Sequence, residues 1–297
     1  MHQTCRICAA TLVPALEGIL DALTAERFSV YRCSHCGIGQ TVPVPADLGR
    51  YYASYYGNRH GVSATYCVKR RLRLLHQSAR PPGRLLDIGC GDGAFLAGAQ
   101  KTGWQTAGTE LKPDAARSLG LDVRYDLEQF AGGERFDCVT LWHSLEHLRD
   151  PRAMLSRIKE ILRPNGALLL AVPDNGGWQA KLFGRHWLHL DVPRHLFHFD
   201  RRSLAGLLES AGFIVERQWH QEWEYDLIGW SQSAMNAIGL KANVFFDVLT
   251  RKCAPDSAAR LAHLGLGAML TAAAAPAVAV SSSLRRGGTL VMRARRR

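Results

Sequence analysis

Four of the eight cysteines occur in two close pairs. Cys5 and Cys8 form one C-x-x-C motif, and Cys33 and Cys36 form a second, with 24 residues between the pairs. Two such motifs supply four thiolates that can converge tetrahedrally, which is the ligand set of a structural zinc ion. Disulfides and a redox-active C-x-x-C are the alternatives. Because two motifs occur together, the sequence favours a zinc ribbon over residues 1–45.

A second set of residues suits the binding of a nucleotide-type cofactor. Residues 84–95 read Arg-Leu-Leu-Asp-Ile-Gly-Cys-Gly-Asp-Gly-Ala-Phe, an apolar strand that runs into a glycine-rich turn. Glycine lets the backbone bend sharply and approach a ligand closely. Asp87 lies inside the motif, and Glu110 closes the next apolar run at a position where a carboxylate could hold a ribose diol. The three glycines are Gly89, Gly91 and Gly93.

The elements that must position these residues follow an alternating strand and helix pattern. Such a pattern predicts an α/β fold with a doubly wound, seven-stranded Rossmann-like sheet, whose ligands lie beyond the carboxyl ends of the strands. The run 27–32 predicts a further strand in the ribbon. The expected organisation is a ribbon over 1–45, a core over 46–221 and 289–297, and a helical insertion over 222–288. The strands of the sheet are expected at about 84–88, 105–109, 122–125, 136–141, 167–172, 213–217 and 289–293.

Four segments together resemble the class I S-adenosylmethionine-dependent methyltransferases, in particular the ubiquinone-biosynthesis O-methyltransferase group. They are residues 85–93, 108–110, 125–128 and 136–151, and the resemblance spans about residues 70–218. It implies that Asp87 and the glycines border the methionine part of S-adenosylmethionine and that Glu110 binds the ribose hydroxyls. It further implies that Asp126 reaches the adenine amine and that Trp142 and His143 lie near the sulfonium.

His143, Glu146 and His147 have the spacing of one face of a helical turn. As two histidines and a carboxylate they could hold a divalent cation, as the resembling quinone methyltransferases suggest, although those carry an acidic residue at the first position. Alternatively, His143 is a general base, while Glu146 and His147 fix the local turn. H-x-x-E-H also matches a zinc-peptidase pattern, which its place inside a methyltransferase series disfavours. We favour the general base over the cation.

Residues 186–199 are rich in histidine and precede the sixth strand, where this fold builds substrate contacts. The stretch is similar to ones in methyltransferases of polysaccharide and lipid-linked biosynthesis, which implies a substrate-facing loop with His189 and His195 as further catalytic candidates. Tyr55 is expected either to cover the ligand or to pack the linker after the ribbon. The alternative for the loop is an internally hydrogen-bonded structure. The substrate candidates are Trp187, His189, Asp191, Arg194 and His195, together with Tyr55.

The insertion contains an uncharged run from Leu261 to Ser283 that is long enough to cross a membrane. A single crossing would place the sixth and seventh strands on opposite sides of the bilayer, which excludes a simple transmembrane helix. A buried helix pair is one alternative. A segment that lies on or dips into a membrane surface is the other, and Arg260, Arg285 and Arg286 at its edges favour it.

Composition and charge limit the function without choosing a substrate. The chain is 47% hydrophobic and 21% charged, as in soluble globular proteins, and its formal charge of +11 suits an anionic partner. An RNA methyltransferase is less favoured, because the ribbon from 5 to 36 carries only Arg6, Arg27 and Arg32 as cations. A non-catalytic cofactor-binding protein is another alternative.

The expected function is methyl transfer from S-adenosylmethionine to a small or lipid-linked metabolite of the saccharide or isoprenoid type. The N-terminal residues lack the basic start and apolar run of a secretory signal. We therefore expect a cytoplasmic protein, with peripheral contact to the inner face of the membrane as a further expectation.

Overall fold

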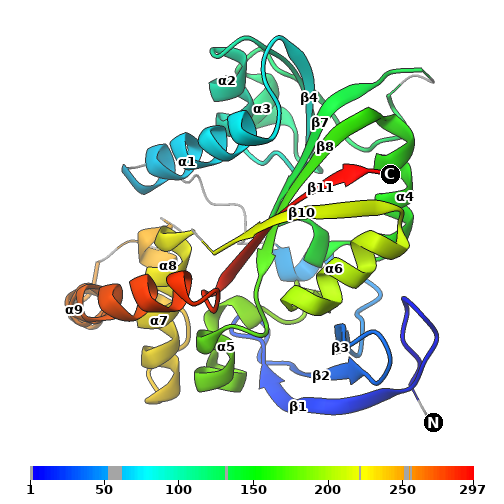
Figure 1. Cartoon of the computed structure of the whole chain (residues 1–297). Helices are drawn as coiled ribbons and strands as arrows, with labels where there is room; N and C mark the ends of the chain where they lie inside the picture. The colour runs from blue at the N-terminus through cyan, green and yellow to red at the C-terminus, as the bar shows by residue number, and fades with distance from the viewer. Residues whose placement is uncertain (1–2, 53–61, 131–132, 221, 251–253, 255) are drawn as a thin grey trace. The chain divides into compact units, whose positions relative to one another are not determined.

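The computed structural model describes residues 3–52, 62–130, 133–220, 222–250, 254 and 256–297 (Figure 1). The chain divides into two compact units. The sheet unit consists of Gly61–Val172, Ala205–Gln218 and Val291–Arg297. The ribbon unit consists of Met1–His60, Pro173–Leu204 and Trp219–Leu290.

The sheet unit is built on a seven-stranded sheet, which confirms the predicted fold class. Its strand order is β10-β11-β8-β7-β4-β5-β6. The five strands from β4 to β8 are joined by parallel pairing, and Figure 1 shows β11 running opposite to β10. The strands are β4 (Gly83–Ile88), β5 (Trp104–Thr109), β6 (Asp122–Arg124), β7 (Phe136–Trp142), β8 (Leu162–Pro173), β10 (Phe213–Trp219) and β11 (Thr289–Arg296).

Helices connect these strands, and local sequence explains where they begin. In α4 (Pro151–Ile161) the Asp150 carboxylate accepts a hydrogen bond from the Ala153 N–H at 2.9 Å, and proline occupies the first turn. Leu155 and Ile158 then point into the core. The other connecting helices are α1 (Val62–Ser78), α2 (Ala94–Gln100), α3 (Asp114–Arg117), the 3-10 turn η2 (Leu145–His147) and α6 (Arg201–Ser210).

The ribbon unit contains a four-stranded sheet of order β1-β2-β3-β9. Its strands are β1 (Leu12–Leu20), β2 (Arg27–Cys33), β3 (Gly39–Val42) and β9 (Phe197–His198). β3 pairs antiparallel with β2 on one side and with β9 on the other. The prolines at 43 and 45 predict an extended linker over residues 41–45, but its first two residues, Thr41 and Val42, belong to β3.

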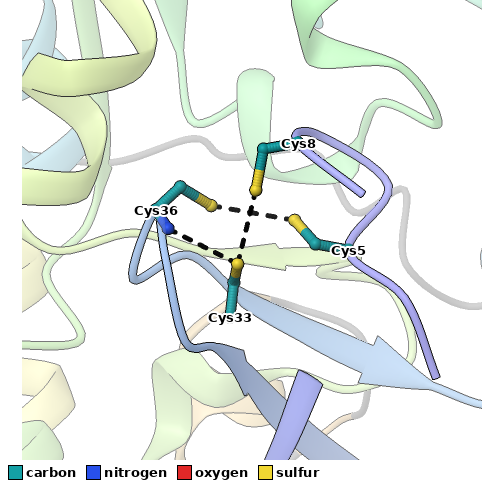
Figure 2. A group of neighbouring side chains, drawn as sticks. All are labelled: Cys5, Cys8, Cys33 and Cys36. Carbon is teal, nitrogen blue, oxygen red and sulfur yellow. Dashed lines mark hydrogen bonds between the residues drawn. The ribbon is translucent and has the colours of Figure 1, made fainter. Parts of the chain in front are cut away.

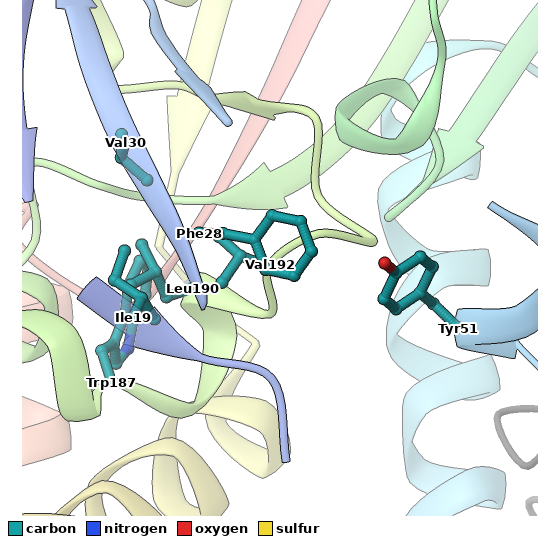
Figure 3. Packing of buried hydrophobic residues seen from close by; sticks show 7 residues of the cluster. All are labelled: Ile19, Phe28, Val30, Tyr51, Trp187, Leu190 and Val192. Carbon is teal, nitrogen blue, oxygen red and sulfur yellow. The ribbon is translucent and has the colours of Figure 1, made fainter. Parts of the chain in front are cut away.

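A hydrophobic cluster holds this small sheet to the loop that supplies β9 (Figure 3). Alternation along β2 turns Phe28 and Val30 to the buried side. The ring of Phe28 meets that of Tyr51, from η1 (Gly49–Tyr52), edge to face at 5.8 Å. Ile19 of β1 and the loop residues Trp187, Leu190 and Val192 complete the cluster.

The described residues of the insertion form three helices in the ribbon unit: α7 (Trp223–Ala237), α8 (Val244–Leu249) and α9 (Ala258–Ser283). α9 packs against α7 and α8, and the Ser257 hydroxyl accepts from the Arg260 N–H at its start. By length and composition α9 could cross a membrane. Short helices precede the insertion: α5 (Trp178–Phe183), η3 (Gly184–His186) and η4 (Leu188–Leu190).

Candidate active site and metal centre

The four paired cysteines converge in the ribbon unit (Figure 2). The Sγ atoms of Cys5 and Cys36 lie 3.7 Å apart, and those of Cys8 and Cys33 lie 3.5 Å apart. All four Sγ atoms lie within 4.8 Å of one another. A tetrahedral zinc site with Zn–S bonds of about 2.3 Å has sulfur atoms roughly 3.8 Å apart. The spacing therefore fits a zinc ion, and none of the described cysteines forms a disulfide.

Backbone donors favour a thiolate within this cluster. Burial alone would raise the pKa of Cys33, but the N–H groups of Cys36 and His35 donate to its Sγ at 3.4 Å, and the pKa is lowered to about 6. Burial raises the pKa of Cys36 and of Cys8. A bound cation would offset that cost, because it stabilises thiolates directly.

Gln40 is a neighbour of the cluster that the sequence analysis did not single out. Its buried Nε2 donates to the Cys5 Sγ at 2.8 Å, and its Oε1 accepts from the N–H of Arg6 at 3.1 Å. The Arg6 guanidinium donates in turn to the Leu196 carbonyl at 2.9 Å and lies over the Phe197 ring. Gln40 thus orients the Cys5 sulfur and links the cluster to β9. No local spacing signals this role.

The glycine-rich turn follows β4 in the sheet unit. Gly89, Gly91 and Gly93 have φ values of +73°, +59° and +79°, a region that favours glycine. A Cβ at Gly93 would lie 2.6 Å from a Leu121 methyl, so this turn packs tightly on the core side. A Cβ at Gly91 would have nothing within 4 Å. The open space at Gly91 is where a ligand could approach the backbone.

Glu110 lies directly after β5 and reaches the same turn. Its Oε2 accepts from the Gly91 N–H at 2.9 Å, and its Oε1 accepts from the Lys112 N–H at 3.3 Å. Asp126 lies after β6 and is exposed, with Oδ1 accepting from the Gln129 N–H at 3.1 Å. Both carboxylates stand past the carboxyl ends of parallel strands, where ligands bind in such sheets.

Asp87 is buried at the end of β4 and accepts a hydrogen bond from the Thr140 hydroxyl at 2.6 Å. Burial raises its pKa to about 7, against the lowering effects of the Thr140 bond and the Arg71 charge. The carboxyl group therefore titrates near neutral pH. When ionised it would attract a cationic ligand.

This titration predicts a pH-dependent stability. The unfolded chain ionises Asp87 near pH 3.8, whereas the folded protein holds the proton until about pH 7. The stability that the protonated Asp87 contributes to the folded protein is fully present below pH 3.8. It falls as the pH rises above 3.8 and is gone once the pH has passed through about 7. Asp87→Asn, which keeps the acceptor for Thr140, should therefore be more stable than the parent at pH 8, with the difference shrinking toward pH 4. Urea unfolding of both proteins across this range measures it, with the exposed Asp122→Asn as control; a pH-independent difference would contradict the shift.

The end of β7 carries the expected base. His143 has a φ of +55°, an uncommon conformation for a residue with a side chain and one that clusters at functional sites. Its Nδ1 lies 3.6 Å from Oε1 of the buried Glu146. The carboxylate oxygen of Glu146 and the ring nitrogen of His147 that could bind a metal ion lie within 4.8 Å of each other. This arrangement suits a base oriented by a carboxylate, and the cation remains a prediction.

Trp142 is buried beside this base. Its ring meets Phe95 edge to face at 5.6 Å, and the Arg71 guanidinium lies over it at 4.9 Å. Among the residues that the structure describes, nothing accepts a hydrogen bond from the Trp142 Nε1. A buried donor without an acceptor is a position where a ligand oxygen or nitrogen could bind.

The loop residues predicted to contact substrate bond to other parts of the ribbon unit. Trp187 Nε1 donates to Gln179 Oε1 at 3.2 Å, and His189 Nε2 lies 3.1 Å from the Tyr225 carbonyl. His195 Nδ1 lies 3.0 Å from the His189 carbonyl. These contacts shape the loop internally. Tyr55 lies outside the described residues.

Arg194 and Asp191 belong to a buried ionic group. The Arg194 guanidinium donates to Asp191 Oδ1 at 2.8 and 2.6 Å and to the Tyr51 carbonyl at 3.2 Å. Its Nη2 atom also lies 3.0 Å from Oδ1 of Asp21, whose side chain is fully buried at the end of β1. The guanidinium thus bridges two carboxylates and joins the loop to the ribbon.

A buried histidine and aspartate pair was not predicted. Asp174 follows β8 and His220 follows β10, and His220 Nε2 lies 2.8 Å from Asp174 Oδ2 with both side chains buried. Asp174 also accepts from the Gly176 N–H at 2.8 Å. The pair fixes the start of the insertion to the loop after β8. The only sequence signal is that each residue directly follows a strand.

Known proteins share the part of the chain that carries the glycine turn. A family model described as a methyltransferase domain matches residues 59–218. A ubiquinone biosynthesis O-methyltransferase of Xanthomonas axonopodis pv. citri is 28% identical over 166 residues, 49% of this chain and 70% of that protein. A Cereibacter sphaeroides protein of the same name is 30% identical over 178 residues, 54% of this chain and 70% of that protein. Phosphoethanolamine N-methyltransferase 2 of Haemonchus contortus has a TM-score of 0.50 at 16% identity, over 82% of this chain and 56% of that chain, a likeness of fold.

Proposed function

Because the chain belongs to the class I S-adenosylmethionine-dependent methyltransferases, we propose that it methylates a small or lipid-linked metabolite of the saccharide or isoprenoid type. That it is a methyltransferase follows from the family; the acceptor class is the proposal. The observation that supports cofactor binding is the 2.9 Å hydrogen bond from the Gly91 N–H to the Glu110 carboxylate, beside the open space next to Gly91.

The residues of the sheet unit fit S-adenosylmethionine. Glu110 would hold the ribose hydroxyls as a charged acceptor, and the glycine turn would admit the methionine part without Cβ atoms in the way. Asp87 would face the cationic end, and Asp126 would accept from the adenine amine. When bound, the cofactor supplies an activated methyl group, so the protein needs to align the acceptor and remove a proton.

His143 is the proposed base. Glu146 is buried 3.6 Å from its Nδ1, so the carboxylate would stabilise the ring after it has taken a proton from the acceptor. Alternatively, His143, Glu146 and His147 would hold a divalent cation, which would lower the pKa of the acceptor group. An activity that survives a chelator favours the base.

We propose a structural zinc ion at Cys5, Cys8, Cys33 and Cys36. Four sulfur donors leave no coordination position for a substrate, so the ion would stabilise the ribbon and take no part in methyl transfer.

The cofactor role predicts a change in affinity. Glu110→Ala should weaken S-adenosylhomocysteine binding by more than tenfold, because charged hydrogen bonds of about 1.5–3 kcal/mol are lost. Isothermal calorimetry measures it, with Glu160→Ala on the exposed side of α4 as the matched control. Equal affinities for Glu110→Ala and the parent would remove the ribose role.

The acceptor class is tested by following a labelled methyl group from S-adenosylmethionine. We expect label in polyprenol-linked saccharides or isoprenoid phenols added to the parent protein, and little transfer by His143→Ala. Label that enters bulk RNA instead would overturn the small-molecule proposal in favour of the RNA alternative.

A further inference from the structure

One side of α9 is exposed and free of charge. The residues that face α7 and α8 recur at helical spacing: Gly267, Thr271, Ala274, Val278 and Ser281. At 100° per residue the opposite side carries Leu261, Gly265, Met269, Ala272, Pro276 and Val280. Only 22% of an apolar 18-residue stretch of this helix is buried. The helix is therefore not a core helix of the ribbon unit.

The large apolar side chains on this outer side are exposed to solvent. Leu261, Met269, Val280 and, just past the helix, Leu284 are between 48% and 61% exposed. Each would leave water on binding to an apolar medium. We call the exposed residues 261–284 the outer face of α9.

Cations lie at both ends of the outer face, and the one at its start, Arg260, is paired with the exposed Asp256. Arg260 lies at its start and the exposed Arg285 and Arg286 at its end, and the sequence contains no acidic residue after Asp256. An uncharged apolar strip between cations is complementary to a bilayer whose surface carries anionic headgroups.

A neighbouring element extends the same chemistry. The Trp178 N–H donates to the Arg286 carbonyl at 2.9 Å, so α5 begins beside the end of α9. On α5, Trp178 is partly exposed, Leu182 is 66% exposed and Lys181 is exposed. Tryptophan beside cations is typical of side chains at the membrane interface.

The geometry excludes a crossing. α9 is about 39 Å long at 1.5 Å per residue, enough to span a bilayer, but its inner side lies along α7, and the strands before and after the insertion, β10 and β11, are neighbours in one sheet. We infer that the outer face of α9 lies flat on a membrane surface rich in anionic lipid. This inference is independent of which acceptor is methylated.

The test uses the full chain and vesicles of phosphatidylglycerol and phosphatidylcholine in equal parts. The parent should sediment with these vesicles, and Met269→Asp with Val280→Asp should weaken binding by at least about tenfold, since two charges would enter the apolar layer. Leu119→Asp, at an exposed apolar residue of the sheet unit, is the matched control and should bind as the parent does. Arg285→Gln with Arg286→Gln should remove the preference for anionic over pure phosphatidylcholine vesicles.

Met269 and Val280 are both exposed, so the double aspartate variant should keep the parent's melting temperature and its affinity for S-adenosylhomocysteine. The inference fails if the parent ignores both kinds of vesicle or if the aspartates leave binding unchanged. It also fails if the parent is a dimer without lipid and the aspartates make it a monomer, because a second copy would then cover the outer face. Cofactor binding is measured separately, so a failure here is distinguishable from a failure of the proposed function.

Discussion

Replacing Cys5 and Cys8 with serine is expected to abolish zinc binding and to unfold the sheet of β1, β2 and β3. The four Sγ atoms lie within 4.8 Å of one another, and structural zinc contributes about 10–16 kcal/mol of folding free energy in zinc-finger peptides. Elemental analysis should give one zinc per chain for the parent and none for the variant. Hydrogen exchange should show lost protection in β2, with β4 and β7 still protected.

Cys67→Ser is the control, because this cysteine lies in α1 and outside the cluster. It should retain the zinc ion and the protection of β2. A metal-free parent that is folded and titrates eight free thiols would refute the zinc proposal.

Arg194→Met is expected to destabilise the ribbon unit by about 3–5 kcal/mol, because it leaves the carboxylate of Asp21 buried without its cation. Urea unfolding followed in this unit measures the loss. If Arg194 acted mainly on substrate, the variant would instead raise KM with an unchanged unfolding midpoint.

Arg157→Met on the exposed surface of α4 is the matched control, since its ion pair with Glu160 is exposed and should contribute under about 1 kcal/mol. Asp21→Asn combined with Arg194→Met should recover part of the stability, because the orphaned charge is gone. Failure of the second change to recover any stability would argue against a buried ion pair.

The sequence predicted best where local spacing carries the information. A stretch of about a dozen residues is enough to predict each C-x-x-C pair, the glycine turn and each strand of the seven-stranded sheet. Glu110 was singled out because it closes an apolar strand, and strand ends determine where such a sheet binds ligands. Asp87 was singled out because it lies inside the glycine motif, and His143 because of its spacing with Glu146 and His147 and the family resemblance.

Contacts between distant segments could not be predicted. β9 joins β3 across more than 150 residues, and Arg194 reaches Asp21 across more than 170. A pattern such as Trp187 to His195 looks the same whether its polar atoms face a substrate or the chain itself, and only the partners, Gln179, Tyr225 and Asp21, distinguish these cases.

The origin of β9 affects how the protein is made. β3 ends at Val42 and its outer neighbour begins at Phe197, so a ribosome must add about 155 residues before the small sheet can close. At about 5–20 residues per second this delay lasts roughly 8–30 s. During that time the nascent ribbon has an unpaired strand edge, a hazard for aggregation. Early binding of a metal ion by the cysteines would stabilise the nascent ribbon until β9, the last strand of the small sheet, has been translated.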